Sequence, residues 1–460
     1  MTTTLSPPVA KQKAPFLPNL PSPKKVLGNQ VVQGVATLTV GSAAAHLMAA
    51  VAAPALTRLY TPDDFGVLAA FTALVGLLTT VGCLGYERAI PLPTKETEAI
   101  SLVSLCGLIL LLMTALLLMG ILCFRPMFVY EGGAGGLEKY IWLVAPACFF
   151  ISLYEALTYY AARTKAFTRL AWTKIYQGAG MIGCQLGWGL TRGGPLGLLV
   201  GDLAGRALGI NWLGRPIVAQ IAAFPSTVSF RSLWKVAKRF WRFPVLTLSS
   251  TLLNRTASHL PKLIMAGVFP PAILGHLMLA DWVLHVPTSL LGQNLARVYI
   301  GEFSERRRNS PQTCRSFFLK FIFWLAVLAS GPMLAIYFLS PVIFKFIFGN
   351  NWETAGQFAR MLAPAILLQF VVSPVSTTLF LSERQELQLV WDTFYSISVC
   401  GSVAIAAALH WEPAAIVGIY AAAEAIAYLT QGVLLMETMR GRLLGTRPSI
   451  DLNVRNNIKG

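Results

Sequence analysis

Apolar residues run through this chain in long blocks that are separated by short polar stretches. Twelve blocks can be marked, and each is long enough for a membrane-crossing helix, which needs about 20 mostly apolar residues. The blocks cover residues 31–56, 66–86, 98–123, 140–161, 172–191, 195–213, 243–267, 272–296, 317–340, 355–381, 388–409 and 412–436. This pattern predicts an all-α polytopic membrane protein with about twelve transmembrane helices.

Composition and charge agree with this prediction. The chain has 460 residues, of which 55% are hydrophobic and 12% are charged, a balance that excludes an ordinary soluble protein. The net charge of +17 would indicate a nucleic-acid partner in a soluble chain. Here 28 of the 37 Lys and Arg residues fall on one side of the predicted helices and 5 on the other. Because cytoplasmic loops carry excess positive charge, this bias predicts that both termini are cytoplasmic, and no nucleic-acid partner is expected.

An internal repeat divides the chain into two lobes. The segment Ala145–Ala147 and the later Trp172 recur in the same order, with similar spacing, as Ala363–Ala365 and Trp391. A repeat after six helices keeps the same direction across the membrane, so the halves are predicted to be parallel repeats. The expected regions are a disordered cytoplasmic tail (1–29), an N-lobe (30–213), a cytoplasmic linker (214–242), a C-lobe (243–436) and a second cytoplasmic tail (437–460).

The linker contains a stretch with two distinct faces. Residues 229–241 place basic and apolar side chains at helical spacing on opposite sides. The basic set is Arg231, Lys235, Lys238 and Arg242, and the apolar set is Phe230, Leu233, Trp234, Ala237 and Trp241. We expect an amphipathic helix on the anionic inner leaflet, and the alternative is a plain positively charged loop.

The seventh block carries a cationic stripe formed by Arg255, His259 and Lys262. Their spacings of four and three place all three on one helical face. A charge within a membrane is costly and usually faces a wet cavity or a partner. The stripe is therefore predicted to bind an anionic substrate group such as a phosphate or pyrophosphate, although Lys262 has the alternative of reaching the membrane surface. His46, in the middle of the first block, is predicted to face Arg255 across the cavity.

Several acidic residues also fall inside the apolar blocks. Glu155 is a candidate for carrying a coupling proton or for pairing with Arg255. Asp281 lies four residues before His285, which fits either a proton relay or a satisfied pair. Asp202 and Arg206 have the same spacing and are expected to form a structural ion pair.

Other kinds of chemistry are absent from the sequence pattern. The 7 cysteines are scattered, without the close spacing of metal ligands, so no metal site and no disulfide are expected. There is no phosphate-binding P-loop, and no cofactor is expected. The predicted outer loops are short, which leaves no outer domain for a catalytic site.

Two further stretches carry a resemblance to a known family. Residues 54–66, PALTRLYTPDDFG, are followed by residues 85–93, GYERAIPLP. Together they resemble the N-terminal signature of bacterial polysaccharide (O-antigen type) repeat-unit flippases of the multidrug/oligosaccharidyl-lipid/polysaccharide exporter superfamily. In that family the residue after Glu87 is commonly apolar, whereas here it is Arg88. Glu87 and Arg88 are included, with Glu155 and Asp281, among the candidate coupling or gating residues.

The resemblance implies a transport function in the bacterial inner membrane and not an enzymatic one. It implies movement of undecaprenyl-pyrophosphate-linked oligosaccharide from the inner to the outer leaflet by alternating access, for O-antigen, lipopolysaccharide or exopolysaccharide synthesis. Expected partners are the lipid-linked oligosaccharide, anionic inner-leaflet lipids, and the polysaccharide polymerase and chain-length machinery. The alternatives are a drug/cation antiporter of the same superfamily, a membrane polymerase or ligase of the same pathway, and a lipid II flippase, for which two more helices are expected.

Overall fold

The computed structural model describes residues 30–130, 136–223, 225–382 and 384–440, and this part of the chain consists of helices joined by short turns, without a β-strand. Both predicted tails lie almost entirely outside these residues. The helices are α2 (Gln30–Leu59), α3 (Pro62–Leu78), α4 (Glu96–Tyr130), α5 (Val144–Arg163), α6 (Phe167–Thr191), α7 (Pro195–Ala207), α8 (Ile210–Ala223), α9 (Phe230–Arg239), α10 (Leu248–Val268), α11 (Pro271–Asn309), α12 (Cys314–Phe348), α13 (Glu353–Val372), α14 (Thr378–Leu381), α15 (Gln385–Ala408) and α16 (Pro413–Met439).

Each predicted apolar block overlaps one or two of these helices. Within the described residues, eight helical segments are long and apolar enough to cross a membrane. The block at 195–213 is divided between α7 and α8, because Gly209 adopts a left-handed backbone conformation (φ +87°) between them. The predicted all-α membrane architecture is therefore confirmed, with interruptions in some helices that the apolar pattern does not reveal.

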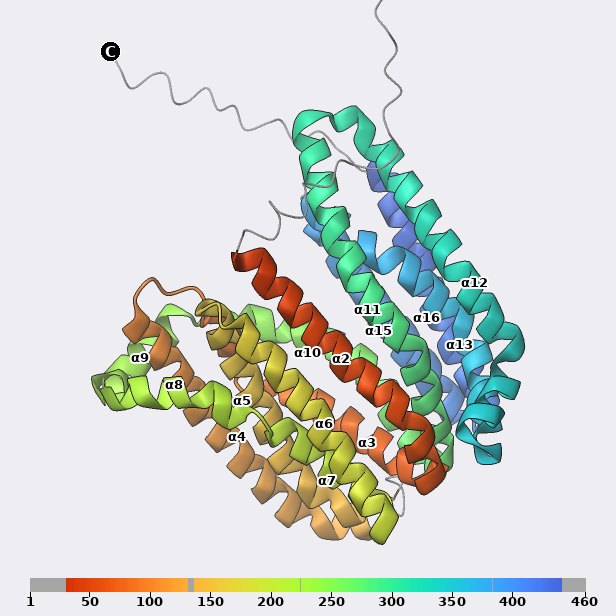
Figure 1. Cartoon of the computed structure of the whole chain (residues 1–460), viewed down its shortest axis with the longest axis horizontal. Coiled ribbons are helices and arrows are strands. Elements are labelled where there is room, and N and C mark those ends of the chain that lie inside the picture. Colours follow the sequence, from red (N-terminus) through yellow and green to blue (C-terminus); the bar gives the residue numbers. More distant parts are fainter. Residues whose placement is uncertain (1–29, 131–135, 224, 383, 441–460) are drawn as a thin grey trace, which may run out of the picture.

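The helices form two groups, α3–α9 and α11–α16, with α2 running between them in the view of Figure 1. Equivalent helices of the two halves make equivalent contacts. The pairs α2/α6, α4/α5 and α6/α7 pack together in the first half, as do α10/α15, α12/α13 and α15/α16 in the second. This correspondence confirms the predicted parallel pseudo-repeat.

The two groups meet where α3 and α11 begin. A Cβ atom on Gly66 would lie 1.8 Å from the carbonyl oxygen of Pro271, and one on Gly275 would lie 1.9 Å from that of Pro62. Only glycine permits so close a backbone approach. The Asp63 carboxylate also accepts the Ala272 N–H at 3.1 Å. We call this contact, formed by residues 62–66 and 271–275, the α3–α11 junction.

Trp352, which directly precedes α13, reinforces the junction. Its indole N–H donates to the Thr57 carbonyl of α2 at 3.0 Å. Its ring packs edge to face against the rings of Phe65 and His276, at centroid distances of 5.1 and 5.6 Å. One side chain therefore contacts α2, α3 and α11 together.

The apolar core is shared at the junction and divided away from it. One buried cluster includes Phe71 of α3, Leu284 of α11 and Ile366 of α13, and so belongs to both groups of helices. Farther from the junction, one cluster contains residues of α4, α5, α8 and α9, and another contains residues of α11, α12, α13 and α16. The core is thus shared at one end, whereas at the other end most of it is divided between the two halves.

Candidate functional site

Close packing of α7 against α6 places a guanidinium in the first half of the protein. Gly197, Gly201 and Gly205 recur every fourth residue on α7, and added Cβ atoms there would meet Tyr60, α6 side chains or the Gln177 carbonyl. Small residues at this spacing let membrane helices approach closely. Asp202 and Arg206 directly follow two of these glycines. The Arg206 Nε donates to Asp202 Oδ2 at 2.6 Å, which confirms the predicted Asp202–Arg206 pair.

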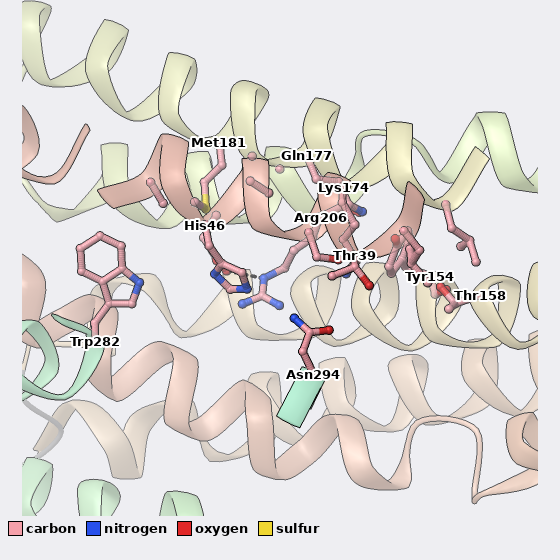
Figure 2. Close-up of a pocket in the computed structure, with 18 of the residues that line it drawn as sticks. Thr39, His46, Tyr154, Thr158, Lys174, Gln177, Met181, Arg206, Trp282 and Asn294 are labelled. Atoms are coloured by element: carbon pink, nitrogen blue, oxygen red, sulfur yellow. Dashed lines mark hydrogen bonds and ion pairs between the residues drawn. The ribbon is translucent and has the colours of Figure 1, made fainter. Parts of the chain in front are cut away.

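A cavity of about 630 Å³ lies beside this pair, between α2, α5, α6, α7 and α11. In Figure 2, His46, Arg206 and Asn294 point into the same space, with Trp282 at one end and Tyr154 and Thr158 at the other. Lys174 and Arg297 complete the cationic part of the lining. We call this space the main cavity.

The main cavity is electrostatically suited to an anion. Among the described residues that line it, Asp202 is the one carboxylate, and it is already bonded to Arg206. The Lys174 ammonium lies 4.9 Å from the centre of the Tyr154 ring, and Arg297 donates to the Thr39 hydroxyl at 3.3 Å. These contacts position both cations without neutralising them.

An apolar extension continues from the main cavity toward the α3–α11 junction. It has a volume of about 140 Å³ and is lined mainly by apolar side chains of α2, α3, α6 and α11, including Leu56 and Phe65. Trp282, Met181 and Asp202 line both spaces. The site therefore combines a cationic chamber with an apolar end that the junction closes.

Arg255 and His259 lie in a second cavity, of about 470 Å³. Arg88 and Asp392 line the same space, together with polar side chains of α10. Arg255 is exposed and makes no ion pair with any described residue. The His259 ring packs against α3, where a Cβ on Gly76 would lie 2.4 Å from it. Arg88, Arg255 and His259 are candidates from the sequence that line this cavity together, whereas Asp392 was not among the candidates.

Lys262 does not join the other two residues of the predicted cationic stripe in this cavity. Its ammonium donates to Asp281 Oδ2 at 2.8 Å. Asp281 also lies 3.2 Å from His285 Nδ1, and His285 Nε2 contacts Gln369 of α13 at 3.0 Å. Lys262 is thus engaged within the second half of the protein, so the structure corrects the expectation of one three-residue binding stripe.

The structure also separates His46 from Arg255. His46 lines the main cavity and Arg255 lines the second one, so these residues do not face each other across a single cavity. Likewise, no ion pair joins Glu155 to Arg255 in the described part of the chain. Glu155 lies instead within electrostatic range of buried Glu87, whose Oε1 is 3.9 Å from Arg88 Nε. The roles of Glu155, Glu87, Arg88 and Asp281 in coupling or gating stay predictions.

Lys174 and Arg297 are functional candidates that the sequence reasoning missed. Lys174 is the third residue of the block predicted to begin at 172, and Arg297 directly follows the block predicted to end at 296. The apolar pattern does not show that α6 already begins at Phe167 and that α11 continues to Asn309. Continued helical spacing brings Asn294 and Arg297 onto the same face, three residues apart.

Comparison with known proteins gives this geometry a context. The family described as "Polysaccharide biosynthesis protein" matches residues 55–357. The teichuronic acid biosynthesis protein TuaB of Bacillus subtilis is 23% identical over 170 residues, which are 36% of this chain and 35% of TuaB. The amylovoran biosynthesis protein AmsL of Erwinia amylovora is 26% identical over 215 residues, 45% of this chain and 52% of AmsL. The matched regions thus span about a third to a half of these relatives.

Solved structures show the same fold at low sequence identity. The lipid II flippase MurJ in an inward closed conformation superposes with a TM-score of 0.66 at 12% identity, covering 91% of this chain and 94% of that one. An inward-facing multidrug resistance MATE family transporter of the MOP superfamily gives 0.64 at 12% identity, covering 88% and 94%. The chain thus shares the fold of these two membrane proteins, with about twelve membrane helices. With this family model matching about two thirds of its length, this multi-pass membrane protein belongs to the polysaccharide biosynthesis protein family.

Proposed function

We propose that the protein moves undecaprenyl-pyrophosphate-linked oligosaccharide from the inner to the outer leaflet of the membrane by alternating access. The observation that carries this proposal is the main cavity, where Lys174, Arg206, Arg297 and His46 surround one space with a single, already bonded carboxylate. A pyrophosphate needs several donors and positive charges in a site with little water. The relatives' roles in teichuronic acid and amylovoran synthesis support a glycan substrate.

The same charges argue against the alternative of a drug/cation antiporter. A cation entering the main cavity would meet Lys174, Arg206 and Arg297, and like charges in a low-dielectric site repel each other strongly. The apolar extension suits the part of a lipid-linked substrate that must stay out of water. An amphiphilic anion therefore fits this site better than a hydrophobic cation.

The division of the core supports a rocking movement of the two halves. With the predicted orientation, the α3–α11 junction lies on the outer side, and the separately packed ends lie on the cytoplasmic side. The described conformation would then receive substrate from the cytoplasmic leaflet. Opening of the junction and closure of the opposite end would release it on the outer side.

The remaining predictions fit this scheme and belong to the same proposal. They include the two-lobe boundaries, the cytoplasmic termini, and partnership with polymerase and chain-length machinery. In α9, Leu233 and Val236 are buried, whereas Phe230 and Trp234 are exposed and stacked at 6.5 Å. Exposed aromatic rings beside basic residues are typical of a helix that contacts anionic lipid.

Replacing Lys174 and Arg297 together by Ala should weaken substrate binding and slow flipping by about 10-fold or more. A hydrogen bond to a charged group contributes about 1.5–3 kcal/mol, and 1.4 kcal/mol corresponds to a factor of ten. The measurement is leaflet exchange of a fluorescent undecaprenyl-pyrophosphate-linked sugar in vesicles that hold equal amounts of protein. Arg192→Ala is the control, because Arg192 is exposed and lies over Trp188, outside the cavity. Wild-type exchange by the double variant would contradict the assigned site.

Arg255→Ala should also abolish or strongly reduce export without lowering the amount of protein. The Arg255 guanidinium lines the second cavity and forms no ion pair with any described residue. Its removal therefore takes away a positive charge that could attract an anionic substrate, and it leaves no carboxylate without its partner. Polysaccharide at the cell surface and protein in the membrane fraction would be measured together. Retained export would show that Arg255 has no role in substrate transport, and it would not contradict the role proposed for the main cavity.

A further inference from the structure

A separate cavity of about 420 Å³ lies where α5 ends and α6 begins, and α8 forms its other wall. This position is the end of a candidate membrane span, Glu138–Arg163, and is therefore at the level of lipid headgroups. Its volume falls within the range of about 300–1,000 Å³ that is usual for small-ligand sites. Helices α5 and α6 border both cavities, but no single residue lines both of them.

Two cations line this cavity without a counter-ion. Lys165 and Arg169 make no ion pair with any described residue. The neighbouring acids are already used, since Glu96 pairs with Arg163 at 3.3 Å and Glu98 pairs with Arg239. The cavity lining contains no carboxylate, so the surroundings favour an anion.

Lys165 has a left-handed backbone conformation at the end of α5, a position where glycine is the usual residue. Lys165 has a φ of +57°, and the chain around it closes α5 through hydrogen bonds from Lys165 N to Ala162 O and from Ala166 N to Ala161 O. This is the helix-ending arrangement in which glycine avoids the steric cost. Lys165 lines the cavity together with Thr164 and Thr168.

The other wall of the cavity is mainly apolar, although Gln220 of α8 also lines it and accepts a hydrogen bond from the Tyr160 hydroxyl. Leu213 and Pro216 of α8 face the polar rim, and Ala161 lies at the end of α5. A site with cations and hydroxyls on one side and an apolar wall on the other matches a phosphate group attached to a lipid glycerol. We propose that this cavity binds a phosphate group, supplied by the headgroup of an anionic phospholipid at the membrane surface.

Retention of phosphatidylglycerol by the purified full-length protein tests this proposal. Native mass spectrometry would compare phosphatidylglycerol with phosphatidylcholine of the same acyl chains. The Lys165→Gln/Arg169→Gln variant should retain at least about 5-fold less phosphatidylglycerol, since each removed cation weakens attraction to an anionic lipid. Lys165→Arg/Arg169→Lys, which keeps both charges, should restore retention and shows that the loss is not one of folding.

Arg58→Gln/Arg192→Gln is the matched control, because both residues are exposed outside the cavity and the same two charges are removed. An equal loss in this control, or full retention by the cavity variant, would overturn the proposal. A competition arm with inorganic phosphate alone separates the two sources of the anion. Retention of lipid against added phosphate supports the lipid headgroup, whereas displacement that depends on Lys165 and Arg169 supports a site for free phosphate.

Discussion

Gly66→Ala should reduce flipping at least about 10-fold while leaving the helices folded. The new Cβ would lie 1.8 Å from the Pro271 carbonyl oxygen, and this atom belongs to backbone that cannot rotate away. The α3–α11 junction would have to separate, so the conformation described here would be disfavoured and the transport cycle interrupted. Leaflet exchange measures the activity. The yield of a disulfide between Asp63→Cys and Ala272→Cys reports on whether the junction still forms, because these residues are hydrogen-bonded in the closed junction.

Gly275→Ala should reproduce this effect, since its Cβ would meet the Pro62 carbonyl oxygen at 1.9 Å. Gly331→Ala in α12 and Gly418→Ala in α16 are the matched controls, because an added Cβ at either position meets no atom within 4 Å. Wild-type flipping and cross-linking in Gly66→Ala would show that the junction has no part in transport.

Lys262→Met should lower the stability of the second half by up to about 3–5 kcal/mol, the cost of removing one partner of a buried ion pair, because the two side chains are only 25% and 20% exposed. The substitution keeps the apolar length of the side chain but leaves the Asp281 carboxylate, now without the ammonium 2.8 Å away, among buried groups. The thermal unfolding midpoint of the purified protein would measure the loss. Lys262→Met/Asp281→Leu should recover much of it, because neither charge then remains unpaired.

Lys345→Met provides the control for this experiment. Lys345 forms an ion pair of similar length with Glu353, at 3.0 Å, but the two side chains are 52% and 47% exposed. Solvent screening limits such a pair to about 1 kcal/mol or less, so the midpoint should hardly change. Equal midpoints for Lys262→Met and the wild type would mean that the buried network does not depend on its ammonium.

The apolar pattern predicted nearly all of the fold, because a membrane leaves few alternatives to helices of about 20 residues. The repeat and the family resemblance then indicated how these helices are arranged. The pattern failed where hydrophobicity stops but the helix does not. The block predicted to end at 296 continues as α11 to Asn309, and the block beginning at 172 starts as α6 at Phe167.

The candidate site was less predictable for a related reason. Lys174 and Arg297 stand at the polar ends of apolar blocks, where a cytoplasmic loop and a cavity wall have the same composition. Lys262 shows the opposite difficulty, because helical spacing placed it on a face with Arg255 but could not reveal that Asp281 of the adjacent helix lies 2.8 Å away. Spacing within one helix is fixed by geometry, whereas partners on other helices depend on packing that no single stretch encodes.

The paired glycines of the α3–α11 junction carry an evolutionary consequence. Gly66 and Gly275 follow Pro62 and Pro271 by the same interval, so the contact has the form of the self-complementary interface of a two-fold dimer. In a dimer of identical subunits, any substitution there would be present twice. In one continuous chain the halves can diverge separately, and they have: Asp63 binds the Ala272 N–H, but its counterpart Ala272 has no carboxylate to return the contact. A single chain with two similar halves can thus keep a symmetric backbone fit while the two sides of the contact carry different chemistry.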